Sequence, residues 1–244
     1  MVSIRKLTSL LATVLVASLV AMPARALVVH NSETPNGNRV LRPINLAILI
    51  QDDLVPGVSN ELPVTRDFIR SLPRGSRVMI GYITSGTLQV RQPFTSNLGE
   101  AAGTLRILAS SISVSPFNPY VEVLEALRKF SPEDNVPNVL LLVSDGLDTS
   151  RGTDSASVLR SIDLDRAISE AKRRGVTIYS FYAPSVGLTS RYSLAASHGQ
   201  GSLNRVSGET GGKAFFQGTT GFVTFNPYFE SLVNALNQRY SLRD

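Results

Sequence analysis

The sequence has no cysteine and no tryptophan among its 244 residues, and it has two histidines, His30 and His198. Without cysteine the chain can form no disulfide framework, no thiolate metal site and no cysteine nucleophile. Two distant histidines do not supply the ligand set of a zinc site. No G-x-S-x-G turn presents a serine at a strand end, so the usual machinery of a serine hydrolase is also missing.

Charged residues are few, at 18% of the chain, whereas 43% of the residues are hydrophobic. This balance excludes a disordered or fibrous protein, and the length favours one sizeable domain. The pI near 9.7 suggests nucleic-acid binding at first sight. However, three basic residues lie in the first 26 positions, which leaves 21 basic against 19 acidic residues in the rest. We therefore expect no nucleic-acid partner.

The first 26 residues have the pattern of an export signal. Arg5 and Lys6 precede an apolar run over 7–22, and Ala24 and Ala26 occupy the small-residue positions of a cleavage site. The apolar run is 16 residues long, shorter than the roughly 20 that a membrane-spanning helix needs. We expect cleavage after Ala26, a periplasmic or extracellular protein, and no transmembrane span in the mature chain.

The remaining chain divides into a polar linker and one domain. Residues 27–43 are polar and rich in proline, asparagine and glycine, which indicates a linker. Residues 44–244 form the expected domain, and its end could be natural or truncated.

Strands and helices alternate along this domain. The runs 44–50 and 139–143 are almost continuously apolar, which is typical of strands buried on both faces of a parallel sheet, and 176–182 is the next predicted strand. Residues 77–84 and 87–94 predict a hairpin. Apolar residues at helical spacing predict helices between these strands, over 64–72, 97–111, 119–130, 164–174, 202–210 and 229–240. The pattern predicts a doubly wound, mostly parallel α/β sheet flanked by helices in a single domain.

Acidic residues follow two of the apolar runs. Asp52 and Asp53 end the first, and Asp145 follows the run 139–143. Ligands of open parallel sheets bind outside the carboxyl ends of the strands, where the strand order reverses. Carboxylates that converge there suit Mg²⁺, which needs only one or two protein carboxylates. The alternative is that the same residues cap a loop and form a turn, without a ligand.

The order of these motifs resembles the von Willebrand factor type A (VWFA) domain over roughly 44–240. The most specific match is the run 139–148, which ends in Ser-Asp-Gly-Leu-Asp, and 167–182 and 209–215 are also similar. Within the family the chain looks closest to exported VWFA-related proteins of acidobacteria, through 68–73, 92–95, 115–116 and 225–228. The resemblance implies a doubly wound fold and a binding role.

The resemblance also implies a metal-ion-dependent adhesion site, which in the family uses Asp-x-Ser-x-Ser, a threonine and the aspartate of Asp-Gly. Asp145 matches the last of these, and the threonine position falls near Asn118 and Ser115. The two serine positions contain no hydroxyl in either register: Leu54 and Pro56 follow Asp52, or Asp53 and Val55 follow Gln51. We therefore expect a degenerate site with weak or absent Mg²⁺ binding by Asp52, Asp53 and Asp145, and no other cofactor.

These observations favour an exported, non-catalytic binding module for a protein or envelope component. Its expected ligand-binding residues are Asp52, Asp53, Ser115, Asn118 and Asp145. One alternative is a Mg²⁺-dependent phosphohydrolase, although haloacid-dehalogenase-type sites need a second acid two residues after the nucleophile. Another is a structural remnant without a ligand. The sequence does not indicate the oligomeric state.

Overall fold

The computed structural model describes residues 42–111, 118–131, 136–150, 161–218 and 223–240. The expected signal peptide, most of the linker and Ser115 lie outside these described residues. Apart from Arg42 and Pro43 at the end of the linker, the described residues all belong to the expected domain.

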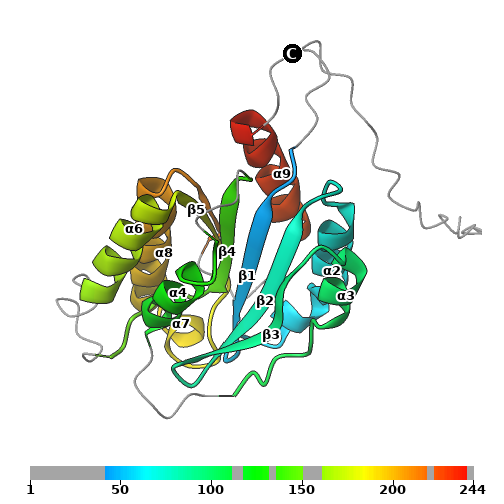
Figure 1. Ribbon diagram of the computed structural model, residues 1–244. Helices are drawn as coiled ribbons and strands as arrows, with labels where there is room; N and C mark the ends of the chain where they lie inside the picture. The colour runs from blue at the N-terminus through cyan, green and yellow to red at the C-terminus, as the bar shows by residue number, and fades with distance from the viewer. Residues whose placement is uncertain (1–41, 112–117, 132–135, 151–160, 219–222, 241–244) are drawn as a thin grey trace, which may run out of the picture. The chain divides into compact units, whose positions relative to one another are not determined.

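A six-stranded sheet forms the centre of the domain, in the order β3-β2-β1-β4-β5-β6 (Figure 1). Its strands are β1 (Asn45–Gln51), β2 (Arg77–Thr84), β3 (Thr87–Thr95), β4 (Asn138–Ser144), β5 (Val176–Tyr182) and β6 (Ala214–Phe215). All neighbours pair in parallel except β2 and β3, which form an antiparallel hairpin at one edge. The strand order reverses between β1 and β4, as in other doubly wound sheets. The predicted fold class is confirmed.

Helices cover both faces of the sheet, which explains why its central strands are apolar at nearly every position. Along β1, Leu46, Ile48 and Ile50 face one core, and Ala47 and Leu49 face the other. The first core is closed by α1 (Gly57–Asn60), α2 (Leu62–Ser71), α3 (Leu98–Gly103) and α9 (Asn226–Tyr240). The second is closed by α4 (Pro119–Leu127), α6 (Ile162–Arg174) and α8 (Ser193–Glu209), and the short α7 (Leu188–Arg191) precedes α8.

Helix α6 shows how closely local sequence can predict an element. Its buried residues, Leu164, Ala167, Ile168 and Ala171, follow the spacing of one helix face. The Ser161 side chain accepts a hydrogen bond from the amide of Leu164 and caps the N-terminus. Gly175 ends the helix with a φ of 65°, and three basic residues occupy the last turn, where the helix dipole favours cations.

Two predicted helix boundaries differ most from the structure. Helix α3 ends at Gly103, whereas the sequence predicted a helix to 111, because the backbone that follows bonds to the sheet edge instead of continuing the helix. The second error concerns 197–200, interpreted as a loop that precedes a helix over 202–210; these residues lie inside α8. Glycine lowers helix propensity, which accounts for the second error.

Gly199 allows α8 to pack closely against the end of β4. A Cβ atom added to Gly199 would lie 1.9 Å from the carbonyl oxygen of Asp145. Gly146 has a φ of 71°, and its carbonyl accepts a hydrogen bond of 2.8 Å from the Tyr120 hydroxyl. The Asp145–Gly146 turn is therefore clamped between α4 and α8, and any larger residue at 199 would push α8 away from the sheet.

None of the helices in the described part of the chain is both long and apolar enough to span a membrane.

Candidate functional site

The carboxyl ends of β1 and β4 meet where the strand order reverses, and both acidic motifs lie there. Gln51 is the last residue of β1 and Ser144 is the last of β4, so Asp52, Asp53 and Asp145 follow at the same edge. Side chains alternate between the two faces of a strand. Asp52 therefore continues the face of Ile50, and Gln51 points to the opposite face. Gln51, and not Asp52, contacts Asp145.

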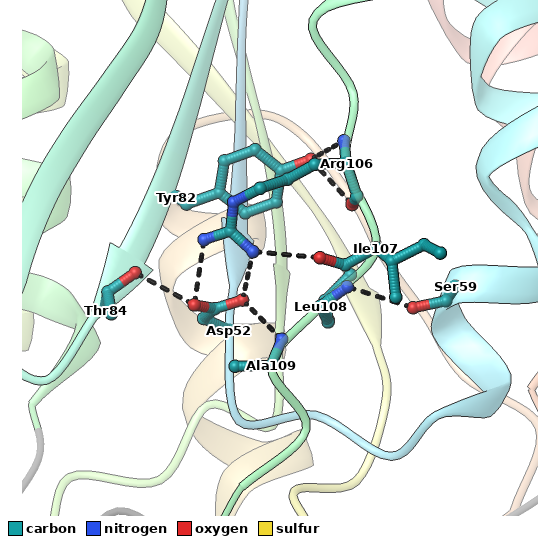
Figure 2. A network of polar contacts seen from close by, with 8 residues as sticks. All are labelled: Asp52, Ser59, Tyr82, Thr84, Arg106, Ile107, Leu108 and Ala109. Carbon is teal, nitrogen blue, oxygen red and sulfur yellow. Dashed lines mark hydrogen bonds and ion pairs between the residues drawn. The ribbon is translucent and has the colours of Figure 1, made fainter.

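Asp52 forms a two-pronged ion pair with Arg106 (Figure 2). Nη1 and Nη2 of Arg106 lie 2.8 and 2.9 Å from Oδ1 and Oδ2 of the carboxylate. The amide of Ala109 donates to Oδ1 at 3.0 Å, and the Thr84 hydroxyl donates to Oδ2 at 3.2 Å. Both oxygens are thus engaged by donors within the domain.

The Arg106 guanidinium is also stacked over Tyr82, with Cζ 4.2 Å from the ring centroid. Burial alone would raise the pKa of Asp52, which is 5% exposed. The hydrogen bonds from Arg106, Ala109 and Thr84 and the positive charge of Arg106 outweigh burial, so the pKa of Asp52 falls below its ordinary value. Asp52 is an ionised carboxylate with its counter-ion built into the protein.

The same contacts fasten the segment 104–111 across the end of β1. The Tyr82 hydroxyl bonds to both the amide and the carbonyl of Arg106. The Leu108 amide donates to Ser59 Oγ at 3.1 Å, and the Ser110 amide donates to the Asp52 carbonyl at 2.9 Å (Figure 2 shows the first of these). The segment carries Ile107, which is 76% exposed. An irregular segment held by several backbone hydrogen bonds thus presents an apolar side chain to solvent.

Gln51 is the hub of the polar cluster on the other face. Its Nε2 donates to Asp53 Oδ1 at 2.7 Å and to Asp145 Oδ1 at 3.2 Å. Its Oε1 accepts from Ser144 Oγ at 2.5 Å and from the Asp145 amide at 3.2 Å. An amide can donate and accept at once, which a carboxylate cannot, so Gln51 links three polar neighbours.

Asp145 is fully engaged within the domain. Besides Gln51, the amide of Leu147 donates to its Oδ1 and the Thr189 hydroxyl donates to its Oδ2, each at 3.1 Å. Asp145 is 3% exposed, and burial raises its pKa despite these donors. Thr189 also accepts from the Ser185 amide at 2.7 Å, which ties the segment after β5 to the end of β4.

Asp53 differs from both of its acidic neighbours. It is partly exposed, and apart from Gln51 and the residue's own backbone amide its carboxylate has no hydrogen-bond partner among the described residues. Burial and the negative charge of Asp145 raise its pKa to about 6, against an ordinary value of 3.8. Asp53 is therefore the acidic residue at this edge that keeps lone pairs for a ligand.

The remaining predicted site residues are not brought to this cluster. Asn118 caps α4, since its side chain accepts from the Tyr120 amide at 3.0 Å and donates to Asp163 at 2.9 Å. This capping role explains the residue without a ligand. Ser115 lies outside the described residues.

Two contacts at the edge were not predicted from the sequence. Arg106 lies 54 positions from Asp52, within a stretch expected to be helical, and Thr189 lies in a segment without a recognisable motif. Neither residue carries a local signal, because its partner is set by the tertiary fold.

The arrangement does not fit a Mg²⁺ ion. Asp52 is neutralised by Arg106, and Asp145 already accepts hydrogen bonds on both of its oxygens, one of them from Gln51 at the end of the neighbouring strand. Within the described residues, no group of three acidic or histidine side chains is placed to hold a metal. Mg²⁺ demands near-octahedral oxygen ligands. The edge instead offers one available carboxylate, that of Asp53.

Comparisons with known proteins establish the fold. No protein-family model matches the sequence, and the search of curated proteins gave no match. Among solved structures, an aerotolerance-related membrane protein from Bacteroides fragilis has a TM-score of 0.55 and 13% identity, over 80% of this chain and 99% of that one. The conserved hypothetical protein BatB from Bacteroides thetaiotaomicron has the same TM-score and identity, over 80% and 98%.

A third structure, the SpRpn10 VWA domain, has a TM-score of 0.48 and 12% identity, over 79% of this chain and 95% of that one. At such low identity, the likeness to the first two structures is one of fold. The chain is thus a doubly wound α/β domain with flanking helices, and its function has to be argued from its own edge residues.

Proposed function

We propose that the chain is an exported, non-catalytic, VWFA-like binding module that recognises a protein or envelope component without a metal ion. The binding site is the carboxyl edge of the sheet between β1 and β4, the usual ligand position in doubly wound folds. One observation carries the proposal. Arg106 forms an ion pair with Asp52, and donors within the domain form hydrogen bonds with Asp145, so this edge can be stable without a metal.

Site-specific photo-crosslinking tests whether this edge is the contact site. A photo-crosslinking amino acid is placed at Ile107, 76% exposed at the edge, and in a control at Ile162, 42% exposed at the start of α6. We expect an envelope extract to give a crosslinked product from position 107 alone, in equal yield with and without EDTA. A product from position 162 alone, or one lost with EDTA, contradicts the proposal.

Export is the second element of the proposal. It is supported by the basic residues, apolar run and small residues of the first 26 positions. We expect N-terminal sequencing of the exported protein to begin at Leu27. A membrane-bound product with Met1 intact would instead show that the segment remains as an anchor.

A phosphohydrolase would need a nucleophilic aspartate at the end of β1. Asp52 is in that position, but Arg106, Thr84 and Ala109 engage its two oxygens. We expect no turnover of a generic phosphate ester with Mg²⁺. Turnover that disappears in Asp52→Asn would overturn the non-catalytic assignment.

A further inference from the structure

A hollow of about 370 Å³ opens between the turn after α8 and the last turns of α9. The turn contributes 211–213 to its lining, the helix contributes Ala235, Gln238 and Arg239, and β5 contributes Tyr179. Ligand sites in proteins start at about 300 Å³, so the hollow has room for a small ligand or for one group of a larger one. None of these described lining residues is acidic.

Two glycines fix the shape of this hollow. A Cβ atom added to Gly212 would lie 2.0 Å from the carbonyl oxygen of Ile178, so the turn packs directly on the first half of β5. Gly211 has a φ of 84°, and its carbonyl accepts a hydrogen bond of 2.9 Å from Nη1 of Arg239, which joins the turn to α9. The amides of both glycines donate to carbonyls at the end of α8. Side chains, and not these two amides, are therefore left to hold a ligand.

Two cations line the hollow without a counter-ion. Lys213 Nζ lies 5.3 Å from the centroid of the Phe215 ring, and within the described ranges it forms no ion pair. Arg239 also has no acidic partner in the described part of the chain. Glu209, the acidic residue nearest to Lys213 in the sequence, pairs with two other cations. Two uncompensated positive charges in one concave site attract an anion.

The Tyr179 hydroxyl is a hydrogen-bond donor without an acceptor. Tyr179 is 2% exposed and lines the hollow, and its hydroxyl forms no hydrogen bond with the described residues. Burial and the neighbouring Tyr240 raise the pKa of Tyr179 to about 12, whereas the charge of Arg239 lowers it. The hydroxyl is therefore protonated at neutral pH. A buried donor without an acceptor costs stability, and a ligand oxygen in the hollow would remove that cost.

We propose that this hollow binds a phosphate group, with Lys213 and Arg239 as the charge contacts and Tyr179 as the hydroxyl donor. The inference goes beyond the proposed function, because the hollow lies beside the first half of β5 and not at the carboxyl edge of β1 and β4. A phosphate monoester carries about −1.5 to −2 charge at pH 7 and three acceptor oxygens, which matches two cations and one neutral donor. A carboxylate has one charge and two oxygens, and it satisfies fewer of these groups.

The probe for the test is glycerol 3-phosphate, with glycerate as the carboxylate control and glycerol as the neutral one. Each is titrated at low salt against the ¹⁵N-labelled protein, and the amide shifts of Gly211, Gly212 and Lys213 report binding in the hollow. We expect glycerol 3-phosphate to bind with a dissociation constant of about 1 mM, about tenfold more tightly than glycerate. Glycerol should cause no shift there, and added salt should weaken the binding of the phosphate.

Variants test the individual contacts. Tyr179→Phe removes an oxygen without a hydrogen bond to the described residues, so it should weaken phosphate binding about fivefold without lowering the melting temperature. Lys213→Gln should weaken binding about tenfold, whereas Lys129→Gln, a control at a side chain 44% exposed and paired with Glu125, should not. The inference is overturned by an absence of shifts at 211–213, by glycerate binding as tightly as the phosphate, or by unchanged affinity in both Tyr179→Phe and Lys213→Gln.

Vesicles distinguish a lipid headgroup from a soluble phosphate ester as the source of the phosphate. Co-sedimentation with phosphatidylcholine vesicles that contain phosphatidic acid, lost in Lys213→Gln, would support the inference with a lipid as the ligand. Binding of glycerol 3-phosphate without co-sedimentation would support it with a soluble ester. Co-sedimentation that survives Lys213→Gln, without binding of glycerol 3-phosphate, would contradict it. None of these outcomes affects the proposed function, which crosslinking from position 107 tests.

Discussion

Asp52 and Asp53 are adjacent acidic residues at the end of one strand, and their surroundings shift their pKa values in opposite directions. Asp52 is 5% exposed and bonds to Arg106, Thr84 and Ala109, so its pKa is lowered. Asp53 is partly exposed and has one side-chain donor, Gln51, so burial and nearby carboxylates raise its pKa to about 6. The residue with less exposed surface is thus the more acidic one.

This contrast shows that burial does not by itself set the charge state of a carboxyl group. Successive side chains point to opposite faces, so residue 52 meets the 104–111 segment and its arginine. Residue 53 lies with Gln51 and Asp145. The charged and hydrogen-bonding groups on the same face of the strand decide whether each carboxylate forms a structural ion pair or stays open to a ligand.

Arg106→Met should have the largest effect on stability, because it removes the counter-ion of Asp52. The variant leaves the Asp52 charge buried and unpaired, and loss of one partner of such a pair costs about 3 kcal/mol. We expect urea denaturation to show a loss of that size. The control Arg70→Met breaks an exposed pair with Asp67, and it should cost less than about 0.5 kcal/mol.

The double variant Asp52→Asn/Arg106→Met distinguishes lost charge pairing from lost packing. With the carboxylate also neutralised, much of the stability should return, since no charge is left buried alone. If the double variant is as unstable as Arg106→Met, the cost comes from the stacking of Arg106 on Tyr82.

Asp53→Asn should change stability in the opposite direction. Because the folded-state pKa of Asp53 is raised, its protonation stabilises the fold fully below the ordinary value of 3.8, and this contribution disappears as the pH rises through about 6. At about pH 7.5 the asparagine variant should be more stable than the unmodified protein by about 1–2 kcal/mol, after allowance for partial exposure.

The pH dependence of unfolding sharpens the comparison between the two residues. The Asp53→Asn gain should vanish near pH 4, when Asp53 itself is protonated. Asp52→Asn should instead destabilise at neutral pH, because a lowered pKa contributes stability above 3.8 that is lost as the pH falls through the folded-state pKa. Parallel pH profiles for the two variants would contradict the opposite pKa shifts.

A smaller effect is expected from Tyr82→Phe, which tests how the 104–111 segment is fastened. The phenylalanine ring keeps the stacking contact with Arg106 but loses the hydrogen bonds to its amide and carbonyl. We expect a loss of about 1 kcal/mol and faster hydrogen exchange at the Arg106 amide. Tyr192→Phe, at a residue 60% exposed, should change neither measurement.

The sequence predicts the strands and the position of the edge because both depend on local patterns. The apolar runs before Gln51 and Ser144 require strands buried on both faces, and parallel strands place their ends together. The partners of the acidic residues depend on distant segments. Arg106 reaches Asp52 because α3 ends at Gly103. The glycine at 103 does not by itself predict that end, because Gly199 lies inside α8.

The smallest expected effect is that of Mg²⁺. Calorimetric titration with Mg²⁺ and Mn²⁺ should release no binding heat, and the melting temperature should not change. Asp52 already has its counter-ion, and Asp53 alone attracts a hydrated ion weakly, with screening over a Debye length of about 8 Å at physiological ionic strength.

The competing hypothesis is that Ser59 supplies the missing hydroxyl ligand to a metal. In the structure its Oγ accepts a hydrogen bond from the Leu108 amide at 3.1 Å, on the face of Asp52 (Figure 2). A metal bound there would have to displace Arg106, so Arg106→Met should then create or strengthen Mg²⁺ binding. Micromolar binding to the unmodified protein that is abolished by both Asp145→Ala and Asp53→Asn would show that a metal site exists on the other face. If no such binding is seen, the opposite pKa shifts of Asp52 and Asp53 arise from the protein's own charges and hydrogen bonds.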